Sequence, residues 1–126
     1  MTITLTTQLE KRHELVVFNG EAVAGTATVT SDGFQNAPYE HMGIYVQATS
    51  VLGTPSVQVL VEFAPVDTAA KYVQLEGGSI HFNITDENPH VDVYAYKVNL
   101  VWARIKIIGQ AGNPSDTLVD VVVTRD

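Results

Sequence analysis

Alternation of apolar and polar residues constrains the fold of this chain more than any other feature. It is clearest in three segments, which begin at Met42, Val57 and Val101. Successive side chains of a β-strand point to opposite faces, so each segment predicts a strand with one face in a core. The expected inward residues are Met42, Ile44, Val46, Ala48 and Leu52, then Val57, Val59, Val61 and Phe63 opposite Gln58 and Glu62, and finally Val101, Ala103, Ile105 and Ile107.

Weaker alternating runs predict seven further strands, and no segment of helical length has helical periodicity. These strands are expected at residues 2–7, 14–18, 22–30, 70–75, 79–84, 91–96 and 117–124. Asn19-Gly20 and Glu76-Gly77-Gly78 predict tight hairpins because Asn and Gly accept positive φ, and longer loops are expected at 31–40 and 85–90. About ten short strands are typical of an antiparallel β-sandwich, so we expect an all-β, jelly-roll-like fold with residues 1–126 as one domain.

Composition limits the classes of partner and chemistry. The 126 residues are 45% hydrophobic, enough for one domain with a real core. The net charge of -7 repels phosphate backbones and anionic lipid, so we expect neither nucleic acid nor a membrane as partner. The absence of cysteine excludes disulfides and thiolate chemistry. The N-terminus resembles no secretory signal, so we expect synthesis in the cytoplasm without a signal peptide.

The densest polar cluster lies between residues 81 and 92. Its carboxylates and amide are the oxygen ligands that Ca²⁺ prefers, but their spacing matches no calcium loop, and the two histidines lack a third zinc ligand. We therefore expect a solvated turn with no metal and no cofactor. The serines lie in no nucleophile elbow, so we expect no enzyme activity. The cluster consists of His81, Asp86, Glu87, Asn88, His90 and Asp92.

Aromatic and cationic residues suggest two kinds of contact surface. Tyr94 and Tyr96 share one face of a strand and Trp102 lies on the next, which could be a sugar-stacking row, a part of the core or a subunit contact. Trp102, Arg104 and Lys106 alternate with an inward apolar set, so they form either a solvated face or an interface. If they form an interface, reversing both charges should weaken association without changing the melting temperature.

Two Gly-x-Pro-Ser tetrapeptides each join a pair of strands, at residues 53–56 and 112–115. Proline lacks an amide hydrogen and glycine permits a sharp change of direction, so both are expected to be corners. Their polar side chains are candidates for contacts at one end of the sandwich, where loops that bind partners gather. These side chains are Thr54, Ser56, Asn113 and Ser115.

Residues 50–124 resemble small virion proteins of tailed bacteriophages. The resemblance lies in the first Gly-x-Pro-Ser turn, the "VQVLVEFAPVD" strand and loop, and the "ARIKIIGQAGNPSDTLVDVVV" hairpin near the chain end. It implies a β-sandwich that decorates the capsid or serves as an accessory head or tail subunit. The implied partners are the major capsid protein or other virion subunits and further copies of the chain, located on the virion. The alternatives are a carbohydrate-binding sandwich using Tyr94, Tyr96 and Trp102 and, less favoured, a hydrolytic enzyme.

Overall fold

The computed structural model describes residues 13–35, 41–74, 81–84, 88–97 and 100–125. The strand expected at 2–7 and the hairpin expected at Glu76-Gly77-Gly78 lie outside these residues. No helix in the described part is long and apolar enough to cross a membrane. The elements are β1 (His13–Ala22), β2 (Thr28–Thr30), β3 (Phe34–Gln35), β4 (His41–Thr49), β5 (Val57–Ala64), the 3-10 helix η1 (Ala69–Lys71), β6 (His81–Ile84), β7 (His90–Lys97), β8 (Trp102–Gly109) and β9 (Leu118–Arg125).

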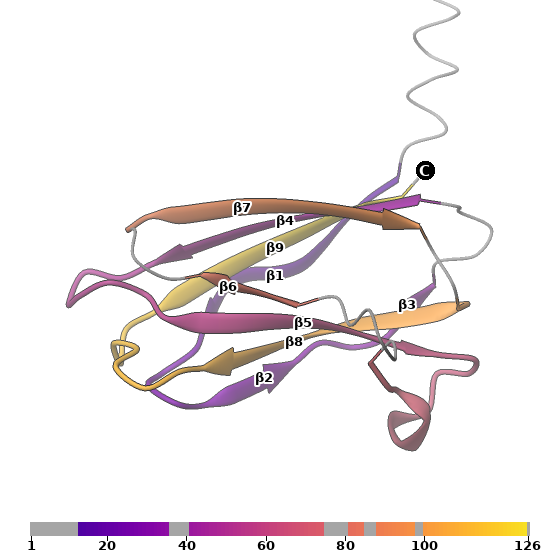
Figure 1. Ribbon diagram of the computed structural model, residues 1–126, viewed down its shortest axis with the longest axis horizontal. Helices are drawn as coiled ribbons and strands as arrows, with labels where there is room; N and C mark the ends of the chain where they lie inside the picture. The colour runs from indigo at the N-terminus through magenta and orange to yellow at the C-terminus, as the bar shows by residue number, and fades with distance from the viewer. Residues whose placement is uncertain (1–12, 36–40, 75–80, 85–87, 98–99, 126) are drawn as a thin grey trace, which may run out of the picture.

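The strands form two layers, as Figure 1 shows. One sheet has the order β1-β9-β4-β7, and the other has the order β2-β8-β5-β6, with β3 also paired to β8. All of the pairings are antiparallel. If β2 and β3 are taken as one interrupted strand, eight strands make two four-stranded sheets, which is the arrangement of a jelly roll. The predicted all-β sandwich is therefore confirmed.

The core between the sheets follows the predicted alternation. In β4 and β8 every second residue is buried. Two residues expected to face inward are exposed instead: Leu52 is 71% and Val101 40% exposed. Both lie outside the strands, where the alternation no longer dictates orientation. The fully buried inward residues include Ile44, Val46, Ala48, Val57, Val59, Val61, Phe63, Ala103, Ile105 and Ile107.

Strand β5 is buried on both faces, which the alternation did not predict. Glu62, expected to face outward into solvent, is only 8% exposed. The chain after β5 folds back, and Phe63 and Val73 exchange two backbone hydrogen bonds of 2.8 and 2.9 Å. The strand expected at 70–75 is therefore wrong. That segment contains the end of η1, where the amide of Lys71 donates to the carbonyl of Thr68, and a single bridge at Val73.

Two glycines account for the errors near the N-terminal strand. Asn19-Gly20 is not a hairpin, because β1 continues through it with a bulge in which Gly20 has a φ of 63° and donates its amide hydrogen to Asp120. The strand expected at 22–30 is interrupted by a turn. Gly25 has a φ of 56° and the amide of Ala27 bonds the carbonyl of Ala24, so only β2 forms there.

Candidate functional site

Part of the predicted cationic face of β8 already makes contacts within the same subunit. Trp102, Arg104 and Lys106 alternate with buried residues, as predicted, and all three are half-buried. The Arg104 side chain pairs with Glu62, with Nε and Oε1 2.8 Å apart. Its guanidinium carbon also lies 4.4 Å from the centre of the Tyr72 ring. Arg104 is therefore a bridge between β8, β5 and the segment after β5.

The same bridge continues through the Tyr72 hydroxyl, which donates to the Asp67 carboxylate at 2.7 Å. Burial, with the hydrogen bond and negative charge of Asp67, raises the pKa of Tyr72 well above its usual value. A Cβ added at Gly33 would overlap both of these side chains. The network fixes the chain around η1 against the five-stranded sheet.

The three aromatic residues proposed for sugar stacking lie on two sheets. Tyr94 and Tyr96 belong to β7, at the edge of the four-stranded sheet, whereas Trp102 belongs to β8 in the five-stranded sheet. The side chains of both tyrosines lie outside what the structure describes. The backbone alone shows that the three residues do not share one sheet face.

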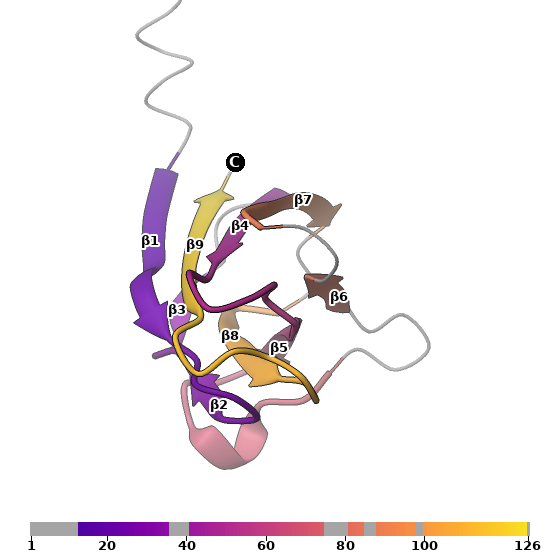
Figure 2. The same cartoon turned by 90° about the vertical axis from the view of Figure 1, so that its left-hand side faces the viewer.

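Asn113 holds three loops together at one end of the sandwich, which faces the viewer in Figure 2. Its Oδ1 accepts hydrogen bonds from the Ser56 amide at 3.0 Å and the Thr117 hydroxyl at 2.8 Å. Its Nδ2 donates to the carbonyls of Val23 and Gly25 at 2.9 and 2.8 Å. Asn113 is only 7% exposed, so its amide stabilises the fold by joining these loops.

The two Gly-x-Pro-Ser tetrapeptides lie against each other. A Cβ added at Gly53 would come 3.1 Å from Cγ of Pro114, so the glycine permits the close approach of the two corners. Thr54 and Ser115 are exposed at this end, in contrast to Asn113. The prediction that these tetrapeptides are corners is confirmed.

Asp116 clamps the loop between β4 and β5. Its carboxylate accepts hydrogen bonds from the Ser50 hydroxyl and from the amides of Val51 and Leu52, the latter two at 2.8 and 3.2 Å. The Ser50 hydrogen bond, with the two amides, holds the pKa of Asp116 below its usual value. The clamp fixes a loop whose Val51 side chain is 94% exposed.

This clamp predicts a defined loss of stability in acid. The pKa of Asp116 in the folded state is below its ordinary value of 3.8, so the stabilisation is complete above that value and is lost as the pH falls through the lower, folded pKa. We expect the Asp116→Asn variant to be less stable at neutral pH and to lose less stability on acidification than the wild type. The midpoint of urea unfolding, measured for the wild type and the variant from neutral pH to below about pH 4, tests this prediction. If the two midpoints changed equally with pH, the prediction would be contradicted.

Asn88, from the predicted acidic cluster, also clamps this loop. Its Nδ2 donates hydrogen bonds to the carbonyl of Gly53, at 2.9 Å, and to the carbonyl of Ser50. Its Oδ1 accepts a hydrogen bond from the Ser50 amide. Asp86 and Glu87 lie outside the described residues, as do the side chains of the other three members of the cluster. Among the residues described, no three His, Asp or Glu side chains gather as metal ligands would.

The outward surface of the β1-β9-β4-β7 sheet, here called the outer face, concentrates exposed apolar side chains. Four residues form one row in direct register across its four strands: Val16, Val122, Tyr45 and Val93. Val16 is 60% and Val93 66% exposed. Of the ten large apolar side chains exposed in the described part of the chain, five lie on this face: Val16, Tyr45, Val91, Val93 and Leu118. This clustering makes the outer face a candidate interaction surface.

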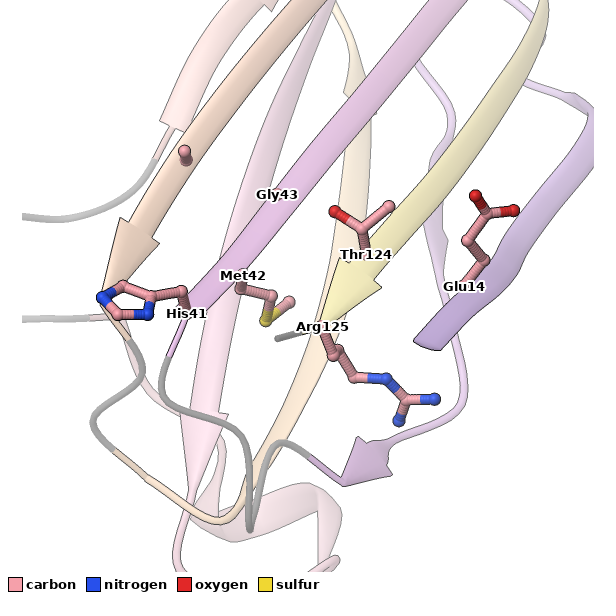
Figure 3. Close-up of a pocket in the computed structure, with 7 residues that line it drawn as sticks. Glu14, His41, Met42, Gly43, Thr124 and Arg125 are labelled. Carbon is pink, nitrogen blue, oxygen red and sulfur yellow. The ribbon is translucent and has the colours of Figure 1, made fainter. Parts of the chain in front are cut away.

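Beside this row lies a cavity of about 360 Å³, which we call the hollow (Figure 3). The adjoining row consists of Glu14, Thr124, Gly43 and Ala95, again in direct register. In this row Gly43 on β4 has no side chain and Ala95 on the edge strand β7 has a small one, and the Thr124 hydroxyl lies 2.7 Å from where a Cβ of Gly43 would be. Its full lining is Glu14, His41, Met42, Gly43, Ala95, Thr124 and Arg125.

Comparison with known proteins identifies a fold and no family. No protein-family model matches the chain, and no curated protein matches it. Among solved structures it is similar to the SPBc2 prophage-derived protein YomS, with a TM-score of 0.54 at 9% identity over 90% of this chain and 91% of that chain. It is also similar to PRD1 vertex protein P5, with a TM-score of 0.53 at 8% identity over 90% of this chain and 95% of that chain.

The same fold occurs outside phages. The K1 cleaved adhesin domain of Lys-gingipain from Porphyromonas gingivalis W83 has a TM-score of 0.55 at 8% identity, over 90% of this chain and 72% of that chain. At these identities the likeness shows the sandwich fold alone. The chain therefore shares its fold with phage proteins and with an adhesin domain.

Proposed function

We propose that this protein is a non-enzymatic structural subunit of a bacteriophage particle, either a capsid decoration protein or a related accessory head or tail subunit. It binds the major capsid protein or another virion subunit and stabilises the shell. In support, the two similar phage proteins match this chain over nearly their whole lengths. Each of them therefore consists of little more than one β-sandwich of the same size as this chain.

The observation that carries this proposal is the outer face. Its apolar row spans all four strands of a sheet in which β1, β9 and β4 bury their opposite surface in the core. A rigid sheet that presents such a row can dock on another protein with little loss of conformational entropy. On a particle, many copies of one modest contact act together, so each contact need not be strong.

The structure favours this function over carbohydrate binding. Sugar stacking by the predicted aromatic row requires rings on one surface, whereas Trp102 and the two tyrosines belong to different sheets. Trp102 is also half-buried in β8, beside the short strand β3.

Particles from the phage or prophage that carries this gene test the proposal directly. We expect mass spectrometry to find the chain in purified particles in a fixed ratio to the capsid protein. Particles lacking the gene should bind added purified protein saturably and gain heat stability. Absence from the particles, with no binding on addition, would overturn the proposal. So would glycan-array binding that Trp102→Ala abolishes.

A further inference from the structure

Asn19 and Gly20 form a bulge in β1, the edge strand that pairs with β9 (Figure 2). The ladder pairing stops at Phe18 and resumes at Glu21, so two residues of β1 lie opposite Asp120 alone. The Asn19 side chain is exposed. Among the described residues, only chain neighbours lie within 4 Å of where a Cβ of Gly20 would be. The peptide bond between Asn19 and Gly20 is therefore open to solvent.

An asparagine followed by glycine is chemically labile. The backbone nitrogen of the second residue can attack the side-chain carbonyl carbon of the first, and a side chain on the second residue hinders this attack. Of the six asparagines in the chain, only Asn19 precedes glycine. Asn88 and Asn113 precede prolines, whose ring nitrogen has no hydrogen to lose, and the other three precede residues with side chains.

We propose that Asn19-Gly20 is a site of spontaneous covalent modification and that Asp120 keeps the reaction slow. In this reaction the Gly20 nitrogen loses its proton to a base in the solvent and bonds to Cγ of Asn19. The Cγ–Nδ2 bond breaks, and the nitrogen that leaves takes up a proton to become ammonia. Water then opens the succinimide ring, either at Cγ to give aspartate or at the backbone carbonyl carbon to give isoaspartate. This inference does not depend on the proposed function.

Asp120 holds the hydrogen atom that the reaction must remove. The Gly20 amide donates a hydrogen bond to Oδ1 of Asp120, and hydrogen bonds to a carboxylate are stronger than those between neutral groups. The attack requires this hydrogen bond to break, because the nitrogen must lose the proton and turn its electrons toward Asn19. The negative charge of Asp120 also disfavours the negatively charged nitrogen that attacks. Asp120 should therefore slow the reaction in two ways.

The modification would damage the pairing of β1 with β9. Aspartate at position 19 would add a carboxylate beside Asp120, and like charges on paired strands repel each other. Isoaspartate would in addition lengthen the backbone of β1 by one carbon atom. By slowing the reaction, Asp120 preserves the edge of this sheet.

The rate of conversion of Asn19 tests the proposal. The folded full-length protein is incubated in mildly alkaline buffer, and peptide mapping by mass spectrometry follows the conversion with time. A synthetic peptide of residues 14–24 gives the unprotected rate. We expect the wild type to react at least about fivefold more slowly than the peptide, and Asp120→Ala at least about fivefold faster than the wild type. Asp120→Asn retains an acceptor oxygen without the charge, so its rate should fall between these two.

Two controls identify the site and the cause. Adding Asn19→Gln to Asp120→Ala should abolish the conversion, because glutamine would have to close a larger ring, which forms much more slowly. Arg104→Glu removes an ion pair in the other sheet and leaves the bulge intact. Its rate should therefore equal that of the wild type, although its stability is lower.

Three results would overturn the proposal. The first is a wild type that reacts as fast as the peptide. The second is Asp120→Ala reacting as slowly as the wild type. The third is Arg104→Glu reacting as fast as Asp120→Ala, because general unfolding would then explain the rate. If thermal melting shows that Asp120→Ala does not fold, Asp120→Asn decides the question, and a rate equal to that of the wild type would contradict the role of Asp120.

Discussion

Replacing Asn113 with alanine should lower the free energy of unfolding by about 3–5 kcal/mol. The change leaves three backbone groups without this partner, the Ser56 amide and two carbonyls of the β1–β2 turn, whereas the Thr117 hydroxyl can still donate to the Pro114 carbonyl. Each buried group left unsatisfied costs about 1–3 kcal/mol, although water entering the space will satisfy some of them. A domain of this size has a stability of about 5–15 kcal/mol, so the loss is a large fraction of it. Equilibrium unfolding in urea measures it.

Two further variants isolate the cause. Ser115→Ala alters an exposed side chain in the same tetrapeptide, so we expect a change within about 0.5 kcal/mol. Asn113→Asp keeps the shape and the acceptor but replaces the donor nitrogen with an oxygen facing the carbonyls of Val23 and Gly25. We expect it to be about as destabilising as alanine. An Asn113→Asp protein as stable as the wild type would mean that the two donated hydrogen bonds contribute little.

The importance of Asn113 shows where prediction from the sequence ends. The corner itself was predictable, because glycine and proline restrict the local backbone. The hydrogen bonds were not, since Asn113 meets Ser56 at a separation of 57 residues and Val23 at 90. Periodicity reports which face of a strand is buried and says nothing about which loops meet at an end of the sandwich.

The outer face was missed for a related reason. Strong alternation in β4 and β8 predicts which residues face inward, and the structure places those residues in the core. β1 and β9 contain runs in which both alternating sets are apolar, "LVVF" at 15–18 and "VVV" at 121–123. Such runs are typical of strands with two apolar faces. They were the available signal that the outward face would present Val16 and Val122.

Arg104→Glu should destabilise the protein by roughly 2–4 kcal/mol. The sequence instead predicted a nearly unchanged melting temperature when the charges of Arg104 and Lys106 are both reversed. Arg104 faces Glu62, and the two side chains are only 18% and 11% exposed. The substitution removes the cation that compensates a buried carboxylate and sets a second carboxylate against it. It also removes the contact with the Tyr72 ring. Urea unfolding of the variant measures this loss of stability. The loss should be smaller than for a fully buried ion pair, because both side chains are still partly exposed to solvent.

Lys106→Glu provides the matched control, because it makes the same charge reversal two residues away on the same face of β8. We expect it to change stability by no more than about 0.5 kcal/mol. The double variant Arg104→Glu with Glu62→Arg exchanges the two members of the ion pair, so opposite charges face each other again. It should therefore recover part of the lost stability. If Arg104→Glu and Lys106→Glu were equally harmless, the ion pair would not hold the segment after β5 in place. In that case Arg104 would again be free to serve as an interface residue.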